Sequence, residues 1–87
     1  MNFNIDFGSL YCFPNRAKSC YDLDGENGCV LFAYTPFVPL EIIKFDVLGV
    51  KEEAWYRLKI LTTSGEIWYV DAKEETINSM EFVTSGV

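Results

Sequence analysis

Histidine is absent from the 87 residues, and this absence narrows the chemistry open to the chain. A serine or cysteine nucleophile needs a neighbouring base, which in many enzymes is histidine. The carboxylate pairs Glu52–Glu53 and Glu74–Glu75 lie in polar stretches, where solvation gives no reason for a raised pKa. The sequence also has no glycine-rich phosphate-binding loop. We therefore expect no catalytic residues, no cofactor and no enzymatic activity.

Closely spaced cysteines are also missing. The three cysteines Cys12, Cys20 and Cys29 stand eight and nine positions apart, whereas zinc sites typically use cysteines separated by roughly two to four residues. An odd number of cysteines does not fit a secreted disulfide scaffold. We expect no metal site and three reduced, mostly buried thiols. Cys20 is expected to be the most exposed of them, because it falls in a predicted loop.

An acidic segment, DLDGENG at residues 22–28, resembles the start of an EF-hand calcium loop. Loop position six should be glycine but is Asn27, and the bidentate glutamate of position twelve is replaced by Ala33. We interpret the segment as a turn-rich acidic loop. A small-molecule or metal-binding domain that uses this loop stays open as an alternative function.

Positive charge is scarce: 7 basic residues face 13 acidic ones, for a net charge of −6. A negative field repels phosphate backbones, so we expect no direct binding of nucleic acid. An acidic decoy that inhibits a nucleic-acid-binding protein is a second alternative function. No apolar run approaches the ~20 residues of a membrane span. The first ten residues lack the features of a signal peptide, so we expect a cytoplasmic protein that does not bind membranes.

Strand-forming residues, in contrast, are abundant. Phe3, Ile5 and Phe7 alternate with polar residues, and a period of two indicates a half-buried strand. Residues 15–28 show no sustained period and predict a long loop, with room for one helical turn. Further strands are predicted over residues 10–13, 29–35, 40–50 and 80–84, with a bulge or bend at Gly49.

The segment WYRLKILTTSGEIWYV predicts a hairpin whose register can be derived. If Thr63, Ser64 and Gly65 form a three-residue loop with Gly65 in the left-handed conformation, Ile60 pairs with Trp68. Beyond the residues next to the loop, every cross-strand pair on one face is then apolar, and Tyr56 and Trp68 belong to this face. A two-residue loop would mix polar groups into both faces, and a slip of one residue exchanges the faces. The cleaner segregation therefore favours the three-residue loop.

The fold predicted from these elements is a single domain over residues 1–87, mainly β. We expect a small, antiparallel, strongly curved sheet or an SH3-like open barrel of five or six strands, with one short helix near residues 72–79. Asp71 and Glu74 have capping-box spacing at the start of that helix, and Ile77 and Met80 would anchor it. The order hairpin, short helix, final strand resembles an SH3-like small barrel over the last third of the chain. An α+β fold is the alternative.

The predicted hairpin leaves a mixed aromatic and basic face opposite the core. An exposed patch of this kind is typical of interaction surfaces, although the N-terminal strand or the long loop could also cover it. Phe37 and Val38, held between Pro36 and Pro39, are a further candidate as an exposed apolar pair. We therefore expect a non-enzymatic protein-binding adaptor or accessory domain. It would bind a protein partner or form a homodimer. The predicted binding residues are Trp55, Arg57, Leu61, Ile67, Tyr69, Phe37 and Val38.

Overall fold

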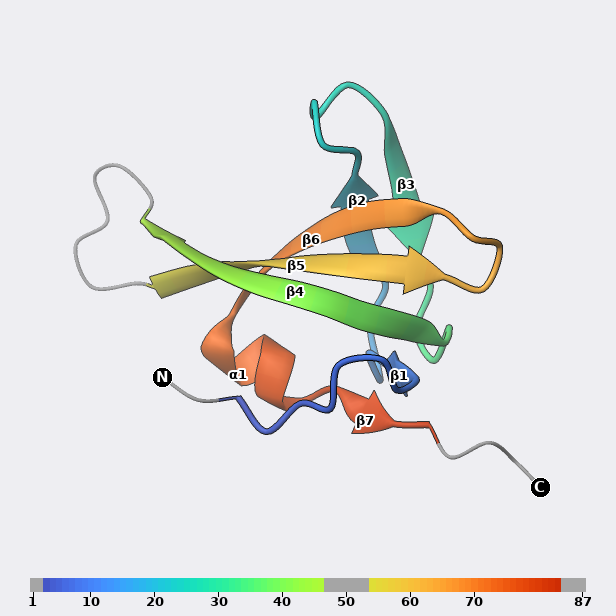
Figure 1. Ribbon diagram of the computed structural model, residues 1–87, viewed down its shortest axis with the longest axis vertical. Coiled ribbons are helices and arrows are strands. Elements are labelled where there is room, and N and C mark those ends of the chain that lie inside the picture. Colours follow the sequence, from blue (N-terminus) through green and yellow to red (C-terminus); the bar gives the residue numbers. More distant parts are fainter. Residues whose placement is uncertain (1–2, 47–53, 84–87) are drawn as a thin grey trace.

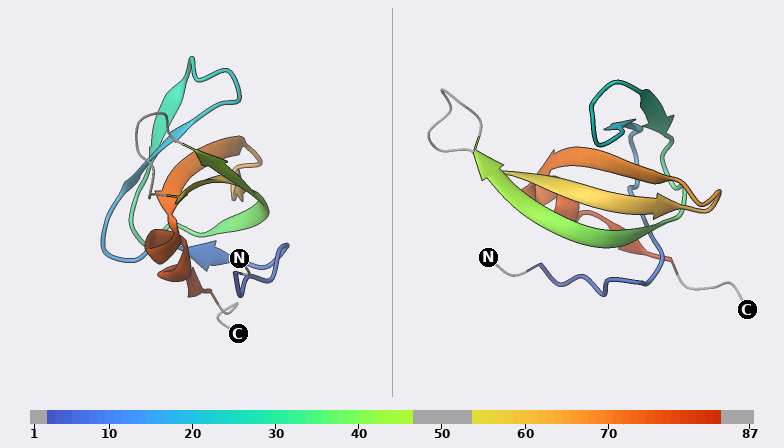
Figure 2. Two further views of the ribbon diagram at one scale, coloured as in Figure 1. Left: turned by 90° about the vertical axis from the view of Figure 1, so that its left-hand side faces the viewer. Right: turned by 45° about the horizontal axis from the view of Figure 1, so that its top comes forward.

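A single curled sheet dominates the computed structural model, which describes residues 3–46 and 54–83. All strand pairs are antiparallel, and the strand order is β3-β2-β6-β5-β4-β1-β7. The three long central strands bend into a half-barrel, as the end-on view of Figure 2 shows. This confirms a mainly β, antiparallel and strongly curved fold with one short helix (Figure 1). In the described part of the chain the elements are β1 (Tyr11–Cys12), β2 (Lys18–Tyr21), β3 (Gly28–Leu31), β4 (Phe37–Asp46), β5 (Ala54–Thr62), β6 (Ile67–Lys73), α1 (Glu74–Asn78) and β7 (Glu81–Phe82).

The β5–β6 hairpin has the predicted register. Ile60 pairs with Trp68, and Leu61 pairs with Ile67. The Thr62 N–H donates to the Glu66 carbonyl at 2.9 Å, which closes a loop of three residues. Gly65 has φ +87°, a conformation that glycine adopts without the steric cost of a Cβ. The loop therefore fixes which side chains of β5 and β6 face the core.

The core fills the concave side of the half-barrel. Phe37, Leu58, Ile60 and Val70 are almost wholly buried there, and Trp68 is half-buried against them. A second cluster joins Tyr56 and Ala72 to Ile77 of α1, with Met80 packed alongside as predicted. Phe3 meets the Tyr56 ring edge-on at 4.8 Å. The N-terminal segment (residues 3–10, which precede β1) and α1 thus cover the same concave side, as Figure 1 shows.

The predicted N-terminal strand is not formed. Residues 3–6 alternate in burial, with Phe3 and Ile5 partly buried and the asparagine and aspartate between and after them exposed, but they join no sheet ladder. The Asp6 N–H donates a hydrogen bond to the Tyr11 hydroxyl at 2.9 Å. Alternation sorts side chains between core and water, but a strand also needs a neighbour to pair with.

The predicted loop over residues 15–28 is wrong as well, because it contains β2 and the turn into β3. Asp22 N–H donates to the Asn27 carbonyl at 3.0 Å and closes a hairpin. β2 has only four residues, Lys18–Tyr21, too few to show a sustained period. The strand predicted over residues 29–35 ends at Leu31 and is an edge strand, and Val30 and Phe32 are exposed.

The PFVP segment opens the central strand β4, which lies between β5 and β1. Phe37 is fully buried in the core, so the prediction of an exposed Phe37 is wrong. The pairing of β4 with β5 shifts register between Pro39 and Glu41. Proline has no N–H to donate to a ladder, which accounts for an irregularity beside it. The bend predicted at Gly49 falls outside the described residues.

The helix occupies only Glu74–Asn78, and the predicted capping box is absent. Its N-cap residue is Lys73, and no side chain caps the helix. Asp71 is still part of β6, two residues before that cap, and its carboxylate binds Arg57 instead. The spacing of Asp71 and Glu74 in the sequence did not show whether Asp71 caps the helix or pairs with Arg57.

Two isoleucines in the same hairpin test the face assignment. Ile60→Ala removes a fully buried side chain and should lower the free energy of unfolding by about 2–5 kcal/mol. Ile67→Ala makes the same chemical change at a side chain that is 42% exposed, so its cost should stay below about 1 kcal/mol. Urea unfolding of dilute protein measures both. Equal costs would contradict the register.

Candidate binding face

On the convex side of β4, β5 and β6, every second side chain of each strand points away from the core. The register pairs Val38 with Leu61 and Leu61 with Ile67 at one end, and Trp55 with Lys73 at the other. Tyr21 of β2 joins the set because it pairs with Tyr69 of β6. We call this the outer face; it consists of Tyr21, Val38, Glu41, Ile43, Trp55, Arg57, Lys59, Leu61, Ile67, Tyr69, Asp71 and Lys73.

One end of the outer face is apolar. Val38, Leu61 and Ile67 lie side by side on three adjacent strands. Ile67 is 42% exposed, and Ile43, further along β4, is 46% exposed. Aliphatic side chains left in water cost about 25 cal/mol per Å2 of apolar surface, so this end gains from contact with another apolar surface.

The centre of the outer face is an aromatic and charged cluster. The rings of Tyr21 and Tyr69 stack with centroids 6.2 Å apart, and the Arg57 guanidinium lies 5.3 Å from the Tyr21 ring centre. Arg57 Nε donates to the Asp71 carboxylate at 3.1 Å, and the Tyr21 hydroxyl donates to the same carboxylate oxygen. One aspartate therefore holds an arginine and a tyrosine in fixed positions.

Electrostatics within this cluster follow from the shared carboxylate. Burial, together with Asp71 as hydrogen-bond acceptor, raises the pKa of Tyr21 to about 12. The hydrogen bond to Asp71 also raises the pKa of Arg57. The side chains of Arg57 and Asp71 are 41% and 31% exposed, so their ion pair contributes only modestly to stability, about 0.2–1 kcal/mol. Its main effect is to orient the guanidinium.

Trp55 and Lys73 form the other end of the face. The Lys73 ammonium lies 5.5 Å from the centre of the Trp55 ring, a cation–π contact across paired strands. Trp55 stays half-buried. The large indole and the two tyrosine rings are thus arranged along the same side of the sheet, separated by Arg57.

Six of the seven predicted binding residues meet on this face, and Phe37 is the one that does not. Tyr21, Glu41 and Ile43 were not predicted to lie on it. Tyr21 was assigned to a loop, and its face is decided by the pairing of β2 with β6, for which the local sequence carries no signal. Ile43 was placed in a strand, but the register shift after Pro39 decides its face, and Pro39 was the available signal.

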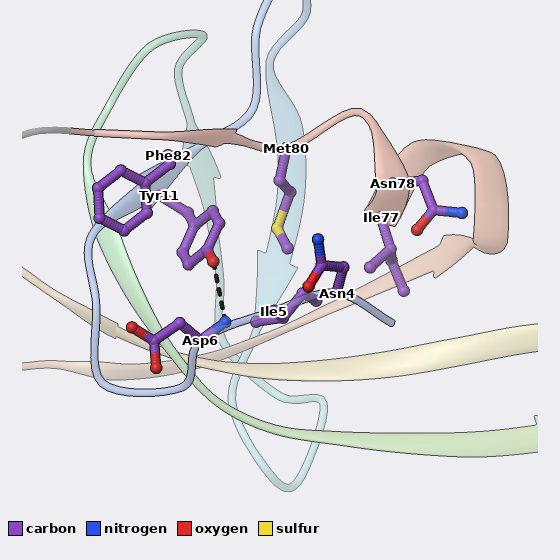
Figure 3. A pocket seen from close by; sticks show the side chains of 8 residues that line it. All are labelled: Asn4, Ile5, Asp6, Tyr11, Ile77, Asn78, Met80 and Phe82. Atoms are coloured by element: carbon purple, nitrogen blue, oxygen red, sulfur yellow. Dashed lines mark hydrogen bonds between the residues drawn. The ribbon is translucent and has the colours of Figure 1, made fainter. Parts of the chain in front are cut away.

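A separate cavity of about 410 Å3 opens on the concave side between the N-terminal segment, α1 and β7. Figure 3 shows Ile77 and Met80 against the side chains of the N-terminal segment, and the Tyr11 hydroxyl bound to the Asp6 N–H. Its polar groups do not converge on a common point in that view. The residues that line the cavity are Asn4, Ile5, Asp6, Tyr11, Ile77, Asn78, Met80 and Phe82.

The acidic turn uses its first carboxylate internally. Asp22 accepts hydrogen bonds from the Glu26 N–H and the Asn27 side-chain amide, and the Asn27 bond is the largest cause of a lowered Asp22 pKa. Across residues 3–46 and 54–83, no three histidine, cysteine, aspartate or glutamate side chains gather as metal ligands would. The three thiols are free, but Cys20 is buried and Cys29 is the more exposed, contrary to prediction.

Comparison with protein-family models, with curated proteins and with solved structures found no match. Among the described residues, no helix has both the length and the apolar character needed to cross a membrane.

The Tyr21 hydroxyl gives a pH test of the central cluster. Its folded-state pKa of about 12 exceeds the ordinary value of about 10, so the protonated phenol stabilises the fold. That stabilisation is complete below pH 10 and is lost as the pH rises from about 10 to about 12. The stability difference between wild type and Tyr21→Phe should therefore be constant up to pH 10 and shrink above it. Chemical unfolding at each pH measures this, and a flat difference would contradict the Tyr21–Asp71 contact.

Proposed function

We propose that the protein is a small, non-enzymatic binding domain whose outer face contacts a protein partner, and that this partner is a second copy of the chain. The observation that carries the proposal is the placement of the covering elements. The N-terminal segment, α1 and β7 all lie on the concave side (Figures 1 and 2). In the described part of the chain, neither the N-terminal segment nor the β2–β3 hairpin crosses the apolar end of the outer face, where Ile67 is 42% exposed.

Charge favours the outer face over the other surfaces of the molecule as the contact between two copies. The chain carries −6, and most encounters between two copies are repulsive. The outer face has three cationic residues, Arg57, Lys59 and Lys73, against two anionic ones, Glu41 and Asp71, a balance of +1. Two copies that meet face to face therefore bring together surfaces that are less negative than the remainder of the chain, and an Arg57 can reach a carboxylate across the seam.

Symmetry and size set the expected strength. A two-fold interface uses the same patch twice, which suits a face with an apolar end and interspersed charges of both signs. Strands β4, β5 and β6 contain 10, 9 and 7 residues, so their outer side measures roughly 25 by 15 Å. A standard interface buries about 800 Å2 per partner. The smaller face here fits a weak, reversible dimer.

Self-association should depend on the two most exposed aliphatic residues of the face. Wild-type protein should sediment faster as its concentration rises, because monomer and dimer exchange. Ile43→Lys with Ile67→Lys replaces the two exposed aliphatic side chains of the outer face by charges and should abolish this dependence. Circular dichroism should remain that of the folded chain, because both side chains lie outside the core.

A matched control makes the same change in net charge on the concave side. Asn4→Lys with Asn78→Lys alters two exposed residues there, and this variant should self-associate like wild type. A dimer that survives the Ile43–Ile67 change would place the interface elsewhere. A wild type that is monomeric at all concentrations would contradict the second copy as partner.

A further inference from the structure

Two of the three cysteines lie directly opposite each other. Cys20 of β2 pairs with Cys29 of β3 in the antiparallel ladder. Opposite residues in such a pair project their side chains to the same face of the sheet. Cys20 is 3% exposed, Cys29 is half-buried, and both pack into the main core cluster. Both thiols are free, so the two sulfurs are neighbours without being bonded.

The ladder fixes the backbone spacing at this pair. The Asp22 N–H donates to the Asn27 carbonyl, and hydrogen-bonded pairs alternate with non-bonded ones in an antiparallel ladder. Cys20 and Cys29 lie two residue pairs beyond Asp22 and Asn27, so they also form a hydrogen-bonded pair. The Cα atoms of such a pair are about 5.5 Å apart. Disulfides form over Cα separations of about 4.4–6.8 Å. Cys12 is paired with Glu81 on a different strand and has no cysteine opposite it.

We propose that Cys20 and Cys29 form a reversible disulfide across the β2–β3 hairpin, by exchange with a small disulfide such as oxidised glutathione. This modification site is independent of the proposed function. The Cβ atoms of opposite residues lie about 4.5–5.5 Å apart, slightly beyond the 3.5–4.5 Å or so of a relaxed disulfide. The strands must draw together, and the strain makes the bond easy to reduce.

The order of the two exchange steps follows from exposure. The Cys29 thiolate attacks one sulfur of oxidised glutathione, the S–S bond breaks, and one glutathione leaves as its thiolate. The Cys20 thiolate then attacks Cys29 Sγ in the mixed disulfide and expels the second glutathione. Two protein thiols are oxidised, one glutathione disulfide is reduced, and the two protons end on the released glutathiones.

The second step should be slow near neutral pH. Burial and the neighbouring Cys29 thiol raise the pKa of Cys20 to about 12, and only the thiolate is nucleophilic. As the pH is raised toward that pKa, the rate of disulfide closure should therefore increase about tenfold per pH unit. The bond would also stiffen a hairpin that the register joins to the sheet through one pair, Tyr21 with Tyr69.

The chain offers convenient cleavage sites for a direct assay. The folded, full-length protein is incubated with mixtures of oxidised and reduced glutathione, then alkylated and digested with trypsin. Residues 19–44 form one peptide that carries both cysteines, whereas Cys12 lies in another. Oxidised protein should yield peptide 19–44 without alkyl groups and lighter by two hydrogen atoms, and Cys12 should be alkylated only after unfolding. A protease that cuts after Glu26 should leave two peptides joined until a reductant is added.

Three variants complete the test. Cys12→Ala should form the bond as wild type does. Cys29→Ser changes a half-buried thiol and should leave Cys20 fully alkylated after oxidation and unfolding. Cys20→Ala should trap glutathione on Cys29. The proposal is overturned if wild type stops at a stable Cys29–glutathione adduct, forms only Cys29–Cys29 dimers, or keeps all three thiols until it unfolds.

Discussion

The register of the β5–β6 hairpin is the constraint on which the rest of the molecule depends. The loop Thr63–Ser64–Gly65 turns the chain with Gly65 at a positive φ, and this fixes Ile60 opposite Trp68. Because side chains alternate between faces, a slip of one residue would move Ile60 into water and Arg57 into the core. The buried side of β5 and its outer side are thus determined by one turn.

Both halves of the structure follow from that turn. On the concave side, Ile5 of the N-terminal segment packs against the cluster of Leu58 and Ile60, and Ile77 of α1 packs with Tyr56. On the convex side the same strand presents Arg57, which Asp71 orients between the Tyr21 ring and the open sheet. In the described part of the chain the covering elements all lie on the concave side, and the outer face keeps its aliphatic end exposed. That asymmetry is the physical basis of the proposed self-association.

Local patterns predicted the elements whose information is local, and failed where distant partners decide. The hairpin register, the anchoring of Ile77 and most of the outer face could be derived, because strict alternation and one glycine specify them. The alternation of Phe3 and Ile5 did not make a strand, since no strand of the sheet pairs with this segment. β2 was missed because its four residues are too few to show a sustained period and its partners are β3 and β6. Phe37 was misplaced because burial in β4 depends on β1 and β5, which no single segment reveals.

The two tryptophans test the central claim most directly, since the chain contains only these two and the hairpin separates them. Trp55 lies on the outer face, and Trp68 packs toward the core. Nuclear magnetic resonance of 15N-labelled protein over a dilution series resolves the two indole N–H signals. The account predicts that the Trp55 signal moves with protein concentration and the Trp68 signal stays fixed. A fixed Trp55 signal, or a moving Trp68 signal beside it, would contradict an outer face that contacts a second copy.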